Sequence, residues 1–109
     1  MVFEQALMTI REGVEDEFAE GFGTIAAPIF AQAEGFVSVE LQRCEERPSV
    51  FLLRVGWESV EAHTERFRGS ELFTQWRAFA NPYFAEPPSV EHFAPVPGSH
   101  ISSPAAHIP

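Results

Sequence analysis

The order in which strand-like and helix-like apolar patterns follow one another constrains the fold of this chain most strongly. Alternating or nearly continuous apolar runs, which are typical of strands, cover residues 2–10, 36–44, 49–57 and 90–96. Apolar residues that recur every three or four positions, as on one side of a helix, cover residues 14–33 and 59–81. This βαββαβ order is that of the ferredoxin-like split arrangement. We therefore predict an α+β, ferredoxin-like domain whose helices lie on one face of a four-stranded antiparallel sheet.

The first helical stretch contains its own interruption. It follows a turn at residues 11–13, and its apolar positions are Val14, Phe18, Phe22, Ile25 and Ile29. Pro28 has no N–H to donate and restricts the residue before it, so we expect the helix to end or kink near Ala27 and to leave a short second turn through Ala33. Glu34 and Gly35 form the predicted stop.

The strands at residues 36–44 and 49–57 are predicted to differ in burial. In the first, Val37, Val39 and Leu41 are expected to share one buried face, since they alternate with polar residues. The second is apolar at nearly every position, which indicates a central strand. Because the helices cover only one face of the sheet, apolar side chains of this central strand would be exposed on the other face. A second copy of the chain is the simplest cover, so we predict a homodimer with its sheets packed face to face.

Length and charge limit the class of protein. The chain has 109 residues, and we expect one domain at residues 1–97 followed by a flexible C-terminal tail at residues 98–109. Its net charge is −9 and it contains no Lys, which argues against nucleic acid or an anionic membrane surface as a partner. No apolar run resembles a membrane span or a signal peptide, so we predict a cytoplasmic protein. His100 and His107 fall in the predicted tail and are expected to have no role in a site.

The segment at residues 55–83 carries the residues best suited to a small-molecule site. Ser59 is the predicted N-cap of a short helix. The inward stripe of this helix is expected to contain Val60, His63 and Phe67. After a break at residues 69–70, the inward face of a second helix is expected to contain Leu72, Phe73, Trp76, Phe79 and Ala80, with Arg77 at its edge. Together with Trp57 at the end of the preceding strand, these residues are typical of an aromatic pocket with a few polar groups.

Each candidate site residue has two interpretations. His63 is either a general base that faces the pocket or a core histidine bonded to a backbone carbonyl. His92, in the last strand, faces the same pocket if it points inward and is a surface residue if it points outward. Trp57 and Trp76 are either core residues or the walls of a site for a planar aromatic ligand. Arg77 either holds a carboxylate, phenolate or enolate oxygen or forms a surface salt bridge.

No metal or nucleotide motif occurs in the sequence. The four histidines and Asp16 show no metal-ligand spacing, and Cys44 alone supplies neither a disulfide nor a thiolate zinc site. We expect Cys44 to be an inert structural thiol. Glycine-rich and Walker patterns are also absent. We therefore predict no metal and no cofactor, so any redox chemistry would proceed without a cofactor or with one bound unconventionally.

These features together resemble the antibiotic biosynthesis monooxygenase family over residues 2–96. The resemblance rests on the βαββαβ order and on Gly35, Phe36, Trp57, Glu58, Ser59, Ala62, His63, Phe67, Ser70 and Phe73. It implies a dimeric α+β barrel with a pocket between the sheet and the helices of each protomer.

Members of this family that form quinones oxidise aromatic polyketide anthrones with molecular oxygen and no prosthetic group. Their strand-end tryptophan matches Trp57, a tyrosine six positions later falls on His63, and an asparagine four positions earlier falls on Leu53. Haem-degrading relatives use a first-strand asparagine, which falls near Gln5, and a haem-ligating histidine, which falls near Arg77. Because arginine cannot ligate iron, haem is not expected here.

The resemblance implies a cofactor-independent monooxygenase that oxidises a small phenolic or quinol-like aromatic molecule with O2. The catalytic residues would be His63 as the base, alone or together with His92, Arg77 to stabilise the anion, and Trp57 as a wall. The substrate-binding residues would be Trp76, His92, Phe84 and Phe67. Two alternatives on the same fold stay open: a non-enzymatic small-molecule binding protein, and an isomerase or lyase that acts on an enolisable substrate.

Overall fold

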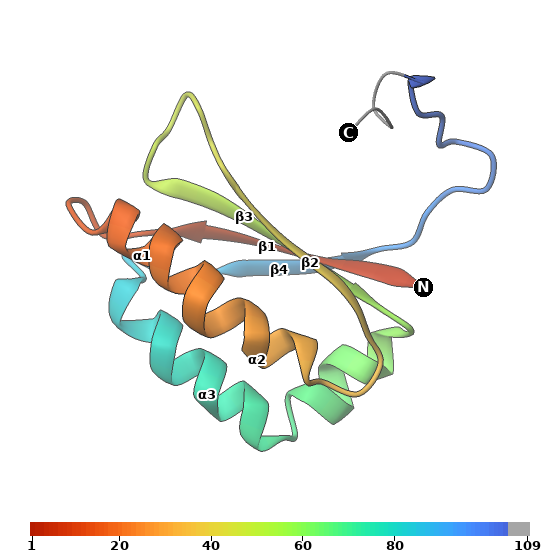
Figure 1. Ribbon diagram of the computed structural model, residues 1–109, viewed down its shortest axis with the longest axis horizontal. Helices are drawn as coiled ribbons and strands as arrows, with labels where there is room; N and C mark the ends of the chain where they lie inside the picture. The colour runs from red at the N-terminus through yellow and green to blue at the C-terminus, as the bar shows by residue number, and fades with distance from the viewer. Residues whose placement is uncertain (105–109) are drawn as a thin grey trace.

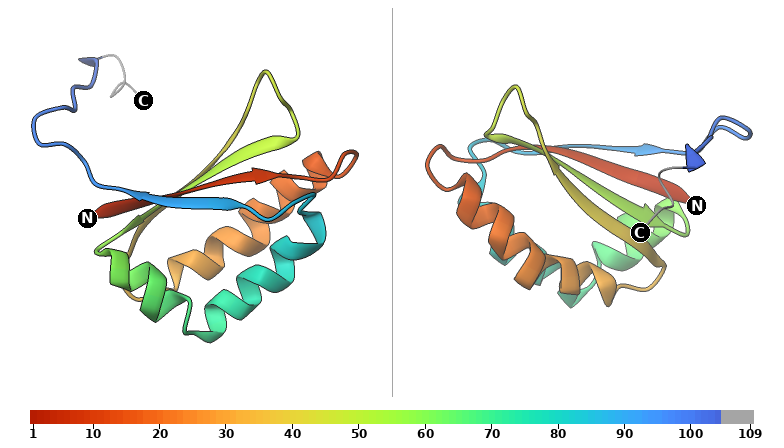
Figure 2. Two further views of the ribbon diagram at one scale, coloured as in Figure 1. Left: turned by 180° about the vertical axis from the view of Figure 1, so that it is seen from behind. Right: turned by 45° about the horizontal axis from the view of Figure 1, so that its top comes forward.

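Four antiparallel strands form one sheet in the computed structural model, which describes residues 1–104 (Figure 1). The helical segments of residues 15–83 all lie on one face of this sheet, as both views in Figure 2 also show. In chain order the elements are β1 Val2–Thr9, α1 Glu15–Gly21, η1 Phe22–Ala26, α2 Ala27–Ala31, β2 Phe36–Arg43, β3 Val50–Trp57, η2 Ala62–Phe67, α3 Glu71–Ala80, η3 Asn81–Tyr83 and β4 Ser89–Phe93. The predicted α+β, ferredoxin-like fold is confirmed.

Strand β3 lies in the middle of the sheet, whose order is β2-β3-β1-β4. It pairs with β2 on one side and with β1 on the other, and β1 also pairs with β4. The central position predicted for residues 49–57 is therefore confirmed. The β3 side chains that face the helices are all fully buried: Phe51, Leu53, Val55 and Trp57.

Strand β2 departs from the simple alternation that its sequence predicts. The ladder with β3 skips from Phe36 to Ser38, so Val37 is an extra residue in a β-bulge. Phe36, Val39 and Leu41 pack against the core, whereas Val37 is 46% exposed. The prediction that Val37 shares a buried face with Val39 and Leu41 is wrong, because the bulge changes the side-chain parity between residues 36 and 39.

The first helical stretch continues through Pro28. Helix α1 is followed by the π-helix η1 and then by α2, and the three form one continuous run in Figure 1. The N–H of Ala27 donates to the carbonyl of Phe22, five residues earlier, so the geometry changes where a kink was predicted. The run ends at Ala31, and Gly35, with a φ of +82°, makes the turn into β2. No helix in residues 1–104 is long and apolar enough to span a membrane.

Strand β4 is shorter than predicted. Its pairing with β1 ends at Phe93 instead of continuing to Val96, because Pro95 has no N–H for the ladder and β1 itself begins at Val2. The chain then leaves the sheet away from the helical layer (Figure 2), and residues 94–104 are exposed. The domain boundary at residue 97 stays a prediction. His107 lies outside the described residues.

The sheet face without helices carries exposed apolar side chains. Leu7 and Phe93 are 45% and 47% exposed. Phe3 is the cross-strand partner of Phe93 and is partly covered by Arg54, whose guanidinium carbon lies 3.9 Å from the centre of the Phe3 ring. The central strand β3 contributes Leu52, which is partly buried. The bulged Val37 of β2 is also on this face, next to Gly56 and Phe3, and is 46% exposed. The most exposed apolar residues of this face therefore lie on β1, β4 and the β2 bulge and not, as predicted, on the central strand.

Candidate active site

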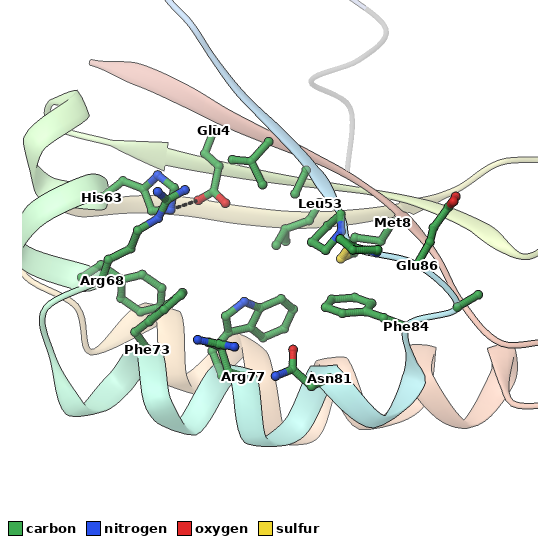
Figure 3. A pocket seen from close by; sticks show the side chains of 17 residues that line it. Glu4, Met8, Leu53, His63, Arg68, Phe73, Arg77, Asn81, Phe84 and Glu86 are labelled. Carbon is green, nitrogen blue, oxygen red and sulfur yellow. Dashed lines mark ion pairs between the residues drawn. The ribbon is translucent and has the colours of Figure 1, made fainter.

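A cavity of about 630 Å³ lies between α3, η3 and the inner face of the sheet. Figure 3 shows Glu4, His63 and Arg68 together at one end and Arg77 and Asn81 along the α3 side. The other lining residues are Ala6, Met8, Leu53, Phe67, Phe73, Trp76, Phe84, Ala85, Glu86, Pro87, Pro88 and Val90. A mainly apolar and aromatic lining with a few convergent polar groups is the usual make-up of a small-molecule site.

Strand β1 turns a carboxylate towards this cavity. Glu4, Ala6 and Met8 occupy alternate positions that face the helices, and Glu4 is only 5% exposed. A buried carboxylate needs polar partners. The indole Nε1 of Trp57, on the neighbouring strand β3, donates a 3.0 Å hydrogen bond to Oε1 of Glu4. The sheet therefore holds the Glu4 carboxylate in one orientation.

The short helix η2 brings His63 to the same carboxylate. Ser59 Oγ accepts a 3.2 Å hydrogen bond from the N–H of Ala62, which is the N-cap contact predicted from the sequence. The segment Ala62–Phe67 is a π-helix, a geometry that is frequent at functional sites. His63 Nε2 lies 3.3 Å from Glu4 Oε1, and its ring stacks on Trp57 with 5.5 Å between centroids.

Strand β4 adds a second imidazole to this cluster. Glu4 and His92 are direct cross-strand partners, so their side chains leave the sheet on the same face. His63 Nδ1 lies 2.7 Å from His92 Nε2, a hydrogen bond in which one ring donates and the other accepts. His92 thus points inward, which is one of the two orientations that the sequence leaves open. It does not itself line the cavity but reaches it through His63.

Burial governs the protonation of this cluster. Desolvation raises the pKa of Glu4, against the opposing effects of the Trp57 hydrogen bond and the positive charge of Arg68. Desolvation lowers the pKa of His63 to about 3, and the charges of Arg68 and His92 act in the same direction. Desolvation and then Arg68 also lower the pKa of His92. Both imidazoles are therefore neutral near pH 7.

Two arginines give the cavity a positive rim on a protein whose net charge is −9. Arg68 follows η2 and Arg77 lies on α3, and both are exposed. Neither takes part in an ion pair within residues 1–104, so the surface salt bridge considered for Arg77 is not found. The guanidinium carbon of Arg77 lies 5.7 Å from the centre of the Phe73 ring. Both guanidinium groups are available to an anionic oxygen of a ligand.

The structure places most of the residues suggested by the sequence around this cavity. Those that line it are His63, Phe67, Trp76, Arg77 and Phe84. Trp57 does not line it, so the expectation that Trp57 forms a wall is wrong. Its indole is 0% exposed, because the side chains of Glu4 and His63 lie between it and the cavity. Leu53, at the position of the family's asparagine, presents an apolar side chain to the cavity.

Glu4 and Arg68 are the candidates that the sequence interpretation misses. The two-residue period of the first strand could have identified Glu4. It occupies every second position together with the apolar Ala6, Met8 and Ile10, and is the charged residue among them. Arg68 carries no comparable signal. It caps the C-terminal end of η2, and the packing of that turn decides where its side chain points.

The cluster is not arranged as a metal site. Among residues 1–104, no group of three or more His, Cys, Asp or Glu side chains is positioned to hold a metal ion. The two nitrogens of His63 face Glu4 Oε1 and His92 Nε2, so these atoms point at one another and not at a common position where a metal ion could sit. Cys44 lies away from the cavity, with Sγ 3.7 Å from Glu46 Oε1.

The sequence is similar to a known protein family and to a bacterial protein. The sequence matches the pattern of the antibiotic biosynthesis monooxygenase family over residues 1–78. It is 42% identical over 96 residues to YczJ, an uncharacterized protein of Bacillus subtilis (strain 168), and the match covers 88% of this chain and 100% of YczJ.

Solved structures agree with this match. An antibiotic biosynthesis monooxygenase family protein from Bordetella bronchiseptica is 38% identical and superposes with a TM-score of 0.83, over 87% of this chain and 96% of that one. A mutant of SnoaB, a cofactor-independent oxygenase from Streptomyces nogalater, is 19% identical and shares the fold with a TM-score of 0.69, over 86% of this chain and 91% of SnoaB. Since the match covers residues 1–78 of 109, from β1 into α3, the chain belongs to the antibiotic biosynthesis monooxygenase family.

Proposed function

We propose that this protein is a cofactor-independent monooxygenase that oxidises a small phenolic or quinol-like aromatic molecule with O2. The observation that carries the proposal is the cavity, in which aromatic walls connect a buried carboxylate–imidazole pair to two arginines without ion-pair partners in residues 1–104. Membership of the family supports it, and SnoaB, which shares the fold, is an oxygenase of this kind.

The substrate itself supplies the electrons in such a reaction. Removal of a proton from a phenol or an activated methylene leaves an anion, whose electron pair then reduces O2. When a methylene becomes a carbonyl, one oxygen atom enters the product and the other leaves as water, so atoms and electrons balance without an added reductant. The protein needs only to orient the ring, accept the proton and stabilise the anion.

The cavity offers a group for each of these tasks. Phe73, Trp76 and Phe84 form walls against which a planar ring can pack. The proton acceptor lies at the polar end, in the pair formed by Glu4 and His63. The arginines at the rim face the developing oxyanion. The role proposed here for Arg77 follows the sequence prediction, whereas the proton acceptor is the Glu4–His63 pair and not His63 alone.

Oxygen uptake tests the proposal directly. Purified protein with a chelator should consume O2 with at least one member of a panel of anthrones, quinols and flavonoid-like phenols. Arg77→Gln should lower kcat/KM by about 100-fold or more, since it removes one stabilising donor for the anion. The matched control is Arg66→Gln, because Arg66 is exposed, pairs with Glu34 at 3.5 Å and does not line the cavity.

Other results would point to the two alternatives. Ligand-dependent quenching of tryptophan fluorescence without oxygen uptake would indicate a binding protein. Product formation under nitrogen would indicate an isomerase or lyase that uses the same proton acceptor.

We also propose that the active form is a homodimer in which the two sheets pack face to face. The exposed side chains of Leu7 and Phe93, together with the partly covered Phe3, support this arrangement because a second sheet would remove them from water. The cytoplasm stays the predicted location.

A further inference from the structure

Glu4, His63 and His92 form a row of three titratable side chains that leads away from the cavity. Each comes from a different element: Glu4 from β1, His63 from η2 and His92 from β4. The two contacts along the row measure 3.3 Å between Glu4 Oε1 and His63 Nε2, and 2.7 Å between His63 Nδ1 and His92 Nε2. Glu4 and His63 line the cavity, whereas His92 is partly exposed to solvent. The row therefore connects the cavity to water.

Only one atom of this row is free to meet a substrate as a proton acceptor. Glu4 Oε1 already accepts from Trp57 and faces His63. Glu4 Oε2 makes no hydrogen bond within residues 1–104, and no fully buried polar side-chain atom there lacks a partner. Because Glu4 also lines the cavity, Oε2 reaches its open volume.

His63, by contrast, has no ring nitrogen to spare for a substrate. Its Nδ1 is bonded to His92, and its Nε2 faces Glu4. An imidazole with both nitrogens facing other titratable groups is suited to passing a proton along, since it can accept on one nitrogen and release from the other.

We propose that Glu4 is the catalytic base and that His63 and His92 conduct its proton to solvent. This proposal rests on the proposed function in one respect, namely that the substrate is a carbon acid or phenol. The substrate C–H or O–H bond breaks, its electron pair stays on the substrate, and the proton binds the Glu4 carboxylate. His63, as the Nδ1–H tautomer, then takes this proton at Nε2, which breaks the O–H bond of Glu4. At the same time its Nδ1 proton moves to His92 Nε2, and His92 releases its own Nδ1 proton to water. One proton enters and one leaves.

The charges around the row are consistent with Glu4 as the base and the two imidazoles as proton conductors. Arg68 is the charged group that acts on all three members, from the turn after η2, and Trp57 faces Glu4 from β3. Burial and Arg68 keep both imidazoles neutral, so neither holds the proton as a charged ring. Burial also makes the ionised form of Glu4 a stronger base than an exposed carboxylate.

Deuterium exchange under nitrogen measures the first step without any oxygen chemistry. The probe is dithranol, a dihydroxyanthrone whose benzylic methylene is a carbon acid. In D2O the protein should accelerate exchange of this methylene above the buffer rate. Glu4→Gln keeps the shape of the side chain but removes the base, and should reduce the excess rate by about 100-fold or more.

Chemical rescue distinguishes a proton conductor from a structural residue. In dilute buffer, His92→Gln should slow exchange, and added imidazole should restore the rate because it replaces the lost path to solvent. A merely structural role for His92 would not respond to imidazole. The matched control is Glu91→Gln on the opposite face of β4, whose rate should equal the wild-type rate at every imidazole concentration.

The outcomes separate this inference from the proposed function. Exchange that depends on Glu4 without oxygen uptake in air would keep the base and remove the oxygenase. Oxygen uptake that Glu4→Gln leaves unchanged would keep the oxygenase and overturn the base. A wild-type protein that does not accelerate exchange would overturn Glu4 as a base for anthrone-like carbon acids.

A measurement on the protein alone tests the coupling of the row. In ¹⁵N NMR titrations, the ring nitrogens of His63 and His92 should change their shifts together at one pH, the pH at which Glu4 titrates. This common step should vanish in Glu4→Gln. If the two rings respond at separate pH values that Glu4→Gln does not alter, the three groups do not share a proton path and the inference fails.

Discussion

Glu4 and His63 show how burial acts on two neighbouring residues of opposite charge type. Desolvation disfavours the charged form of each, so it raises the pKa of the carboxyl and lowers that of the imidazole. Relative to the unfolded chain, the folded state binds the Glu4 proton more tightly and the His63 proton less tightly. The Glu4 shift therefore lowers stability as the pH rises, whereas the His63 shift lowers stability as the pH falls.

Single variants should reveal these opposite signs. In Glu4→Gln, only the His63 contribution of this pair is left. The His63 imidazole of the unfolded chain gains a proton below pH 6.5, whereas that of the folded state gains one only near pH 3. Stability should therefore fall as the pH falls from 6.5 towards 3. In His63→Gln, only the Glu4 contribution of this pair is left. As the pH rises above 4.5, the Glu4 carboxyl of the unfolded chain loses its proton before that of the folded state does. Stability should therefore fall as the pH rises from 4.5.

Urea unfolding between pH 4 and 8 measures both slopes, with the double variant as the baseline for all other groups. The slope from a single proton cannot exceed about 1.4 kcal/mol per pH unit. Slopes of the same sign in the two single variants would contradict this account of the pair.

At the scale of elements, the position of η2 depends on the turn that precedes β2. Gly35 adopts a φ of +82°, and a Cβ added there would lie 2.7 Å from the Cβ of Ala62. The carbonyl of Gly35 also accepts a 2.8 Å hydrogen bond from the N–H of Glu58. The turn and the start of η2 therefore leave no room for a side chain, and His63 follows Ala62 directly.

Gly35→Ala should destabilise the fold through two separate effects. The backbone conformation costs about 1–2 kcal/mol for a residue with a Cβ, and the contact with Ala62 adds to that cost. Gly13→Ala is the matched control, since Gly13 has a φ of +96° but nothing within 4 Å of an added Cβ. Unfolding free energies from urea titration should be lower for Gly35→Ala than for Gly13→Ala. Equal losses would mean that the contact with η2 contributes nothing.

At the scale of the whole molecule, the two faces of the sheet differ in their cover. The inner face is covered by helices (Figure 1). The outer face presents Leu7 and Phe93 to solvent. In the proposed dimer this outer face is buried, whereas the cavity lies on the helical side of each protomer and would stay accessible.

Sedimentation at micromolar concentration tests the dimer. The wild-type protein should sediment at about twice the 12.2 kDa mass of one chain. Leu7→Glu should shift it to the monomer, because a carboxylate would be buried in the interface without a partner. Ile25→Glu, at a 53% exposed position in η1 on the helical side, should remain dimeric. A wild-type monomer, or equal dissociation by both variants, would contradict the proposed interface.

Particular residues show how far the sequence predicts the site. His63, Trp76 and Phe67 are predicted near one pocket because they follow a helical period, which depends only on local geometry. Gln5 is the first-strand position suggested by the family resemblance, yet its cross-strand partner is Glu91, on the face away from the helices. The neighbouring Glu4 points into the cavity. The pairing register of β1 decides which of Glu4 and Gln5 faces the helices.

The sequence by itself determines the order of the elements, the central position of β3 and the aromatic side of the cavity, since each follows from periodicity within one segment. The tertiary structure alone decides that Val37 bulges out, that Trp57 is hidden behind Glu4 and His63, and that His92 completes the row. The reason is physical: Glu4 and His92 are far apart along the sequence, and only the pairing of β1 with β4 makes them neighbours.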